Sequence, residues 1–418
     1  MSDSQVQKPA IWWDPSTPPH IATLVLMTGV AAMSMNVFLP SLPGMAVYFD
    51  ADFALVQLAV SGYLAMTALI QLLLGPLSDR YGRRPVLLGS TIVFALATIG
   101  CIVAPTIEIF LVFRMAQAGI ATGIALSRAI VRDMVSSDKA ASMIGYVTMG
   151  MALVPMIAPM IGGLLEQFFD WRANFAFMLV AGLVLLWVAA RDLGETNHAR
   201  SASLTEQFRA YPELARSQRF WGYAFTAAFA SGSFFAFLGG ASYIGASVYG
   251  LDPATTGFYF GFIAVGYMTG NFIIGRFSTR IGLNRMMAAG TLIAVAALSV
   301  ACGLYALGVL HPLAFFLPVM LMGLGNGLTM PSATAGSVLV RPHLAGSASG
   351  LSGTLMVGGG ALISAVTGLL LDEDGSAWPL LVMMIGSAVL ALLTTLAVMT
   401  VARRRGPLAT ETATPAGP

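Results

Sequence analysis

Arg114 is the charged residue that stands deepest inside an apolar stretch of this chain. A guanidinium is costly in lipid, so we expect it to face the protein interior or a water-filled cavity. The alternative is that its long side chain extends to the water interface on the outer face of the bilayer. None of the 19 acidic residues lies well inside an apolar stretch, and Glu108, Asp133 and Glu166 come nearest to the end of one. These residue types favour binding of a neutral or anionic compound over bond-making chemistry.

No pattern of enzyme residues accompanies this arginine. The sequence contains no nucleophile elbow, no HExxH and no phosphate loop, and a membrane-embedded enzyme would need several titratable groups at one depth. Cys101 and Cys302 lie in apolar stretches, so we expect small buried side chains rather than metal ligands or a disulfide. We therefore expect no enzyme, no cofactor and no metal site. The formal net charge of +2 gives no reason to expect nucleic-acid binding.

The composition places these residues in an integral membrane protein. Only 10% of the residues are charged, whereas an ordinary soluble domain carries roughly 25%. A spanning helix needs about 20 mostly apolar residues, and it satisfies its own backbone hydrogen bonds in lipid. Such stretches predict an all-α protein with about twelve transmembrane helices, at 20–42, 54–77, 86–104, 107–127, 140–165, 172–190, 221–247, 256–276, 286–308, 312–335, 344–370 and 378–402.

The polar segments between the spans indicate the orientation and the domain boundaries. Apart from Arg114 and Arg172, all of the 21 Lys and Arg residues fall on one side of the predicted membrane. By the positive-inside rule that side is cytoplasmic, and so are both termini. The predicted parts are a cytoplasmic N-tail (1–19), a six-helix half (20–190), a cytoplasmic linker (191–220) with a surface helix over 204–214, a second six-helix half (221–402) and a cytoplasmic C-tail (403–418).

The loop after the second span carries a charged motif with glycines. Residues 75–85 read GPLSDRYGRRP, and residues 275–282, after the eighth span, read GRFSTRIG, a degraded copy. The glycines allow a tight turn between two helices, and the charges keep the segment out of lipid. The motif resembles the loop signature of the major facilitator superfamily. Copies at equivalent positions of the two halves are expected for the parallel repeats of that fold.

This resemblance implies a gating role for the loop. In the family, the acid at the position of Asp79 pairs with basic groups and a facing helix N-terminus, and it helps to latch the outward-open state. Arg128 or Arg132 would be the partner here, and the alternative is a solvated loop charge. The gating residues that the resemblance implies are Asp79, Arg80, Gly82, Arg83, Arg84, Arg128, Arg132 and Asp133.

Spans four and five extend the resemblance. Residues 114–119 (RMAQAG) resemble the family's Arg-x-x-Gln-x-x-Gly element, and span five resembles the glycine-proline element of drug exporters, with Ala158-Pro159 in place of Gly-Pro. Small residues permit close helix packing, and proline kinks a helix. The positions expected to act in this way are Gly75, Gly150, Pro155, Pro159, Gly162 and Gly163.

Three further stretches are similar to the Bcr/CflA-type drug-resistance transporters of the same superfamily. They are residues 39–43 (LPSLP), 127–133 (SRAIVRD) and 345–350 (AGSASG), and the resemblance covers about residues 20 to 400. It implies a monomeric transporter in the bacterial inner membrane that exports drug-like molecules by alternating access in exchange for protons. The alternative is an uncoupled or differently coupled transporter of a small metabolite. A receptor or channel fits the two half-domains less well.

One position departs from the Bcr/CflA pattern. The pattern has an aspartate three residues before the Leu-Pro of span one, and this chain has Asn36, which does not titrate in the relevant range. Three possibilities follow. A peripheral acid such as Glu108 or Asp133 carries the proton, the substrate itself carries the charge or proton, or the protein is a uniporter.

A substrate cavity is expected near the membrane midplane between the two halves. Its lining should be mainly apolar and aromatic with a few polar anchors, although any one aromatic residue is more often part of the helix packing than of a pocket. The candidates by depth are Met33, Asn36, Tyr63, Arg114, Gln117, Phe234, Phe235, Tyr267, Asn271 and Asn326. The expected partners are therefore a small-molecule substrate, protons and the lipid bilayer.

Overall fold

The computed structural model describes residues 12–15, 17–134, 137–197, 213–341, 344–371 and 375–405. All regular elements within these ranges are helices, which confirms the all-α prediction. The predicted surface helix at 204–214 falls almost wholly outside the described residues. The elements of the first part of the chain are α1 (Ile21–Asn36), the short 3₁₀ turn η1 (Leu39–Ser41), α2 (Leu42–Phe49), α3 (Phe53–Tyr81), α4 (Arg83–Val103), α5 (Ile107–Gln117), the 3₁₀ turn η2 (Ala118–Ala121), α6 (Thr122–Met134), α7 (Ser137–Phe168) and α8 (Trp171–Asp192).

The second part of the chain is made of six long helices. They are α10 (Gln218–Ser247), α11 (Pro253–Ile281), α12 (Leu283–Ala306), α13 (Pro312–Leu339), α14 (Ala345–Leu370) and α15 (Trp378–Arg405). Across both parts, 11 stretches of the described residues are long and apolar enough to cross a membrane. The remaining predicted span, 140–165, coincides with α7, although many side chains in the first half of that helix lie outside the described part of the structure.

Spans one and four are discontinuous, which the sequence analysis did not predict. The first span does not end at residue 42: α1 stops at Asn36, the chain makes a 3₁₀ turn, and α2 continues to Phe49. Span four changes from α5 to α6 through the 3₁₀ turn η2, directly after Gln117. Such interruptions free backbone groups for other partners, and membrane proteins tolerate them only where the protein interior supplies those partners.

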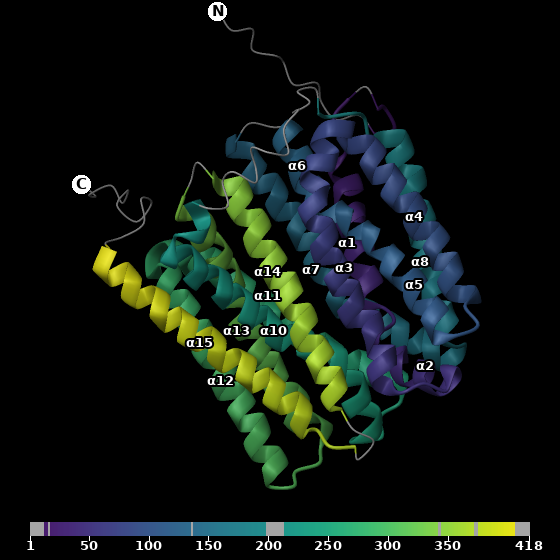
Figure 1. Cartoon of the computed structure of the whole chain (residues 1–418), viewed down its shortest axis with the longest axis vertical. Helices are drawn as coiled ribbons and strands as arrows, with labels where there is room; N and C mark the ends of the chain where they lie inside the picture. Colours follow the sequence, from purple (N-terminus) through teal and green to yellow (C-terminus); the bar gives the residue numbers. More distant parts are fainter. Residues whose placement is uncertain are drawn as a thin grey trace, which may run out of the picture.

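The helices pack into two groups, and two pairs of helices form most of the contact between them. Figure 1 shows the elements from α1 to α8 on one side and those from α10 to α15 on the other, with α14 and α11 beside α3 and α7. The main contacts between the groups are α3 with α14 and α7 with α11. Smaller contacts join α10 to α2, α3 and η1, and α11 to η1. α2 lies at the opposite end of the first group from α6 (Figure 1). The end that carries α2 is called the outer end below, because the charge pattern predicts that it faces outward.

The two groups touch closely at the outer end. Gln57 on α3 donates from Nε2 to the Ser364 carbonyl of α14 at 2.8 Å. Gly163 near the end of α7 lies against the Pro253 backbone at the start of α11, where a Cβ would have no room. The Ser242 hydroxyl of α10 donates to the Leu39 carbonyl of η1. The outer end is therefore closed by short polar and backbone contacts between the two groups.

The two copies of the charged loop motif adopt the same turn. Gly82 joins α3 to α4 with φ of 101°, and Gly282 joins α11 to α12 with φ of 88°. Only glycine takes this left-handed conformation without strain. The degraded second motif has therefore kept the backbone geometry of the first, as parallel repeats require.

Glycines also allow α11 and α13 to approach until their backbones touch. At four positions a Cβ would meet a backbone carbonyl of the facing helix far inside the normal contact distance. These positions are Gly266 and Gly270 on α11 and Gly323 and Gly327 on α13. Close approach of this kind is the main source of helix association in lipid, where no hydrophobic effect acts between helices.

We predict that Gly266→Val destabilises the protein in detergent, because the added atoms force α11 away from the Met320 carbonyl of α13. The expected loss of unfolding free energy is about 1–3 kcal/mol, measured by thermal or denaturant unfolding of the purified protein. Gly303→Val on α12 is the matched control, since no atom lies within 4 Å of its added Cβ. Equal losses for both variants would contradict this account of the packing.

Candidate functional site

Arg114 lies at the centre of a buried polar network in the first half. Its side chain is fully buried. The alternative, in which the side chain extends to the water interface on the outer face of the bilayer, is therefore wrong. Nε donates to the Ala59 carbonyl at 3.1 Å, Nη2 donates to the Ser34 carbonyl at 2.8 Å, and Nη1 donates to Oε1 of Gln117 at 2.7 Å. Within the described ranges no carboxylate forms an ion pair with it.

The charge is stabilised by groups other than an acid. Ser34 belongs to the last turn of α1, whose carbonyls have no partner in the helix and carry the negative end of the helix dipole. The guanidinium also lies over two aromatic rings, with its central carbon 4.4 Å from the Phe38 ring centroid and 4.0 Å from that of Tyr63. Cation–π contacts are strongest where water is excluded. The break in span one therefore creates the acceptor that Arg114 uses.

The network extends to two further helices. Gln117 donates from Nε2 to the Thr98 hydroxyl on α4 at 2.7 Å, and the Ser34 and Tyr63 hydroxyls are 2.7 Å apart. Gln117 is thus fixed by Arg114 on one side and by α4 on the other. The network ties α1, α3, α4 and α5 together through hydrogen bonds at one depth. Three of the five guanidinium N–H groups are used in these bonds, which leaves donors for a further acceptor.

Asn36 lies at the end of α1, beside the break. Its Nδ2 donates to the Ala32 carbonyl at 2.7 Å, while its Oδ1 is buried and accepts no hydrogen bond in the structure. A buried acceptor without a donor is uncommon and marks a place where a donor from a ligand or water would be stabilising. The side chain is 3% exposed, so such a donor needs access from the protein interior.

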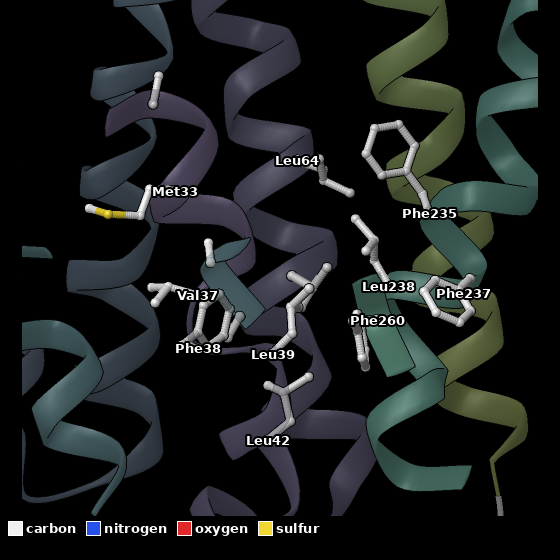
Figure 2. Packing of buried hydrophobic residues seen from close by; sticks show 14 of the residues in the cluster. Met33, Val37, Phe38, Leu39, Leu42, Leu64, Phe235, Phe237, Leu238 and Phe260 are labelled. Carbon is white, nitrogen blue, oxygen red and sulfur yellow. The ribbon is translucent and has the colours of Figure 1, made fainter. Parts of the chain in front are cut away.

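Of the candidates in the second half, Phe235 lies at the interface with the first half. Figure 2 shows Phe235 and Leu238 of α10 pointing toward Leu64 of α3, while Met33 points away from the second half. Met33 is therefore placed less favourably for a ligand between the halves than its depth suggested. Phe235 is buried and Phe234 is half-buried.

The polar candidates of the second half are bonded within that half. Asn271 donates to the Tyr267 carbonyl at 2.9 Å on α11, and Asn326 of α13 donates to the Ser233 hydroxyl of α10 at 3.4 Å. Tyr267 and Asn271 are half-buried, whereas Asn326 is buried. The structure therefore places Arg114 and Gln117 in one network, but it does not join the second-half residues to that network.

The charged loop motif forms a second cluster at the end opposite the outer end. Arg83 is buried, and its Nε pairs with the Asp133 carboxylate of α6 at 3.1 Å. Its Nη1 donates to the Ser78 hydroxyl at 2.5 Å. Asp133 also accepts from the Thr196 hydroxyl at 3.3 Å. Because Asp133 is engaged in this cluster, it is a poor candidate for the proton carrier that the sequence analysis left open.

Glu195 completes this cluster, and the sequence analysis missed it. Its carboxylate accepts the backbone N–H groups of Arg83 at 2.9 Å and Arg84 at 3.4 Å, the first residues of α4, and that of Asn197 at 2.9 Å. An acid at a helix N-terminus satisfies unpaired N–H groups and interacts favourably with the dipole. Its signal in the sequence was an acid in the segment directly after span six, on the side that the charge pattern predicts to be cytoplasmic.

The remaining motif residues are placed as follows. Arg84 donates to the Ala190 carbonyl at 2.8 Å, Arg80 is exposed with its guanidinium 5.4 Å from the Tyr81 ring centroid, and Arg128 is exposed. The side chains of Asp79 and Arg132, and the surroundings of Gly75 and Gly150, lie outside the described part of the structure. The latch role predicted for Asp79 therefore stays a prediction.

Span five contacts both halves through its small residues. A Cβ on Gly162 would meet the Val37 carbonyl at the break of span one, and one on Gly163 would meet the Pro253 carbonyl of α11. Pro155 is half-buried and Pro159 is buried inside α7. Glu108, the other proposed proton carrier, is exposed at the outer end of α5. Of the two cysteines, Cys101 is buried and Cys302 only half-buried, and both are free thiols.

Two groups of helices that are long and apolar enough to cross a membrane define a polytopic membrane protein. The model described as Major Facilitator Superfamily matches residues 24–364 and 244–417. The chain belongs to the major facilitator superfamily, and it is a secondary transporter rather than an enzyme.

Several bacterial transporters are similar to it over most of their length. An uncharacterized MFS-type transporter of Bacillus subtilis (strain 168) is 30% identical over 378 residues, which cover 88% of this chain and 92% of that protein. A chloramphenicol resistance protein of Pseudomonas aeruginosa is 30% identical over 370 residues, with coverage of 86% and 87%. The multidrug resistance protein D of Escherichia coli (strain K12) is 27% identical over 374 residues, with coverage of 87% and 92%.

Solved structures confirm the fold. A bacterial homolog of the human lysosomal transporter Spinster, in an inward-facing and unoccupied conformation, matches with a TM-score of 0.74 at 16% identity. The match covers 95% of this chain and 98% of that one. A D-xylose–proton symporter matches with a TM-score of 0.73 at 13% identity, covering 90% and 96%. At these identities the likeness concerns the fold alone.

We predict that Arg114→Lys destabilises the protein although it keeps the charge. A lysine ammonium is a compact donor and does not reproduce the planar fork that reaches Ala59, Ser34 and Gln117. Each lost bond to the charged group should cost about 1.5–3 kcal/mol of unfolding free energy, measured by denaturant unfolding in detergent. Arg191→Lys at an exposed position is the control, with an expected change within about 0.5 kcal/mol. A stable Arg114→Lys protein would refute the geometric argument.

We also predict that Glu195→Ala lowers the unfolding free energy by about 0.5–2 kcal/mol, the usual effect of losing a helix cap. The control is Glu213→Ala. Glu213 pairs with Arg341 at 3.1 Å, but both side chains are nearly half-exposed, and exposed pairs contribute little. The same unfolding measurement compares the two variants. If Glu213→Ala lowers the unfolding free energy as much as Glu195→Ala does, the Glu195 cap on α4 contributes no more to stability than an exposed ion pair.

Proposed function

We propose that this transporter exports small drug-like molecules across the bacterial inner membrane by alternating access, as a monomer with both termini in the cytoplasm. We further propose proton antiport as the driving reaction. The similarity to a chloramphenicol resistance protein over 86% of the chain supports an exporter of drugs. The Bcr/CflA-type motifs in spans one, four and eleven support the same subfamily.

The buried charge of Arg114 is the observation that supports a particular class of substrate. It has unused N–H donors and no carboxylate partner among the described residues. Among the described residues no carboxylate pairs with this guanidinium, so a cation bound beside it would find no counter-charge there, whereas carbonyl, hydroxyl or anionic groups find a donor. We therefore propose that the substrates are neutral or weakly anionic compounds with acceptor groups beside an apolar body. Phe235, Leu238 and Leu64 at the interface would contact that body.

A second candidate function is transport of a small metabolite without proton coupling. Asn36 favours it, because the Bcr/CflA-type aspartate is absent from span one and Asn36 does not titrate. Its buried Oδ1 has no donor in the structure, so it is suited to accept a hydrogen bond from a substrate in place of binding a proton. The two functions differ in whether a pH gradient drives transport.

Purified protein in liposomes will separate these candidates. A neutral phenicol-like drug is assayed with and without an imposed pH gradient, in the wild type, in Asn36→Asp and in Asn36→Ser, which removes the amide without adding an acid. We expect gradient-driven transport by the wild type, abolished when an ionophore collapses the gradient. Transport that becomes gradient-driven only in Asn36→Asp would show that the chain lacks proton coupling at this position. Absence of drug transport in every condition would contradict the proposed substrate class.

A further inference from the structure

The chain before α1 is docked on the first half of the molecule. The described residues of 12–20, called the N-terminal segment below, fold back onto the end of α8. The backbone N–H groups of Trp13 and His20 donate to the two carboxylate oxygens of Asp192 at 3.2 and 2.9 Å. The Thr23 hydroxyl at the start of α1 donates to the same carboxylate at 2.5 Å. Asp192 is fully buried, so this carboxylate holds the segment in a fixed position.

The docked segment brings tryptophans together at the end of α8. The Trp13 ring centroid lies 4.9 Å from that of Trp187 on α8. Trp12 stacks on Trp13 at 5.7 Å and on the His20 ring at 4.7 Å. Three of the six tryptophans of the chain therefore gather here. Their exposed fractions are 48% for Trp12, 43% for Trp13 and 53% for Trp187, so a large part of each indole faces away from the protein.

Trp187 belongs to the face of α8 that points away from the other helices. Exposed residues recur along α8 at spacings of three and four, which places them on one face of the helix; they include Val180, Leu183, Val184 and Trp187. Because α8 is long and apolar enough to cross a membrane, this face contacts lipid. Trp187 stands about 7–8 Å along the helix axis before Asp192, at the end of α8. Tryptophans are enriched at the level of the headgroups, so the bilayer is what covers the exposed indoles.

Positive charge lies next to these rings. Arg191 follows Trp187 by one turn of α8, is exposed, and has its guanidinium carbon 5.6 Å from the Trp187 ring centroid. Among the described residues no carboxylate forms an ion pair with it. Arg84 of α4 donates to the Ala190 carbonyl at 2.8 Å, which brings a second guanidinium to the same end of α8. A guanidinium binds a phosphate group through two parallel N–H bonds, so Arg191 is suited to bind one beside the indoles.

We propose that Trp12, Trp13, Trp187 and Arg191 form a binding site for the headgroup of an anionic phospholipid. Arg191 binds the phosphate group, while the indole rings contact the acyl chains just below it and keep their N–H groups at the polar level. A zwitterionic headgroup carries a positive charge beside its phosphate, so it gains less from the two guanidinium groups. Asp192 acts as a positioning residue, because it holds the N-terminal segment at the level of the headgroups.

This site does not depend on the proposed transport function. It lies on the lipid-facing side of the first half, whereas Arg114 and Asn36 are buried inside that half. The proposed substrate and its coupling to protons can therefore fail without affecting the lipid site. Equally, the lipid site can fail without affecting the proposed substrate.

Fluorescence quenching by brominated lipid tests the site in the full-length protein. The protein is reconstituted in phosphatidylcholine liposomes in which a rising fraction of the lipid is phosphatidylglycerol brominated near the headgroup end of its acyl chains. Phosphatidylcholine brominated at the same positions is the reference lipid. A variant with Trp12, Trp13 and Trp187 changed to phenylalanine reports the other tryptophans, and its signal is subtracted. We expect the remaining signal to be quenched by both lipids and, at low fractions, more strongly by the anionic one.

Two charge variants test the role of Arg191. Arg191→Gln should lower the preference for the anionic lipid about fivefold, the effect of one basic residue beside an anionic surface. Arg285→Gln is the matched control and should keep the preference, because Arg285 is an exposed arginine at the start of α12 in the other half. Excess inorganic phosphate, compared with chloride at the same ionic strength, should leave the quenching unchanged.

Three kinds of result would overturn the proposal. Quenching of the wild type no stronger than that of the triple tryptophan variant would show that the three indoles do not contact lipid. Equal quenching by the two lipids, or a full preference that survives in Arg191→Gln, would exclude an anionic headgroup bound by this arginine. Relief of the quenching by inorganic phosphate would identify a free anion as the ligand in place of a lipid.

Discussion

Burial of the Arg114 charge without an acidic partner constrains the whole first half of the molecule. Removing a guanidinium from water costs several kcal/mol unless other groups replace its hydration. Here the replacement comes from carbonyls of α1 and α3, from Gln117 and from the rings of Phe38 and Tyr63. The Ser34 carbonyl is open to the guanidinium because α1 stops at Asn36, two residues further on. The interruption of span one is thus part of the same arrangement as the buried charge.

The two ends of the transporter are built from different interactions. At the end opposite the outer end, the α3–α4 turn is held by charges, with Arg83, Asp133 and Glu195 connecting α4, α6 and the segment after α8. At the outer end the two halves meet through glycines and backbone carbonyls, as at Gly163 and Pro253. Charged groups remain stable when such a contact opens to water, whereas close backbone packing is lost over a small displacement.

The absence of acids from the interior of the spans directs attention to the ends of the helices. In the described part of the chain, Asp133 and Asp192 are engaged by hydrogen bonds or ion pairs, and Glu108 is exposed. Glu166 differs from them, because one of its oxygens is buried without a donor.

The sequence alone determined the membrane class, the helical fold, the repeated loop motif and the family, because apolar length, charge asymmetry and glycine-containing turns are local properties of the chain. It also singled out Arg114, since an arginine within a span is costly wherever it points. Only the tertiary structure decided that this arginine turns inward onto the end of α1, that Glu195 caps α4 from a distance of more than a hundred residues along the chain, and that Asp192 holds the N-terminal segment against α8. Those partners come from segments far apart in sequence. Their meeting depends on how the helices break and pack, which no local pattern of residues records.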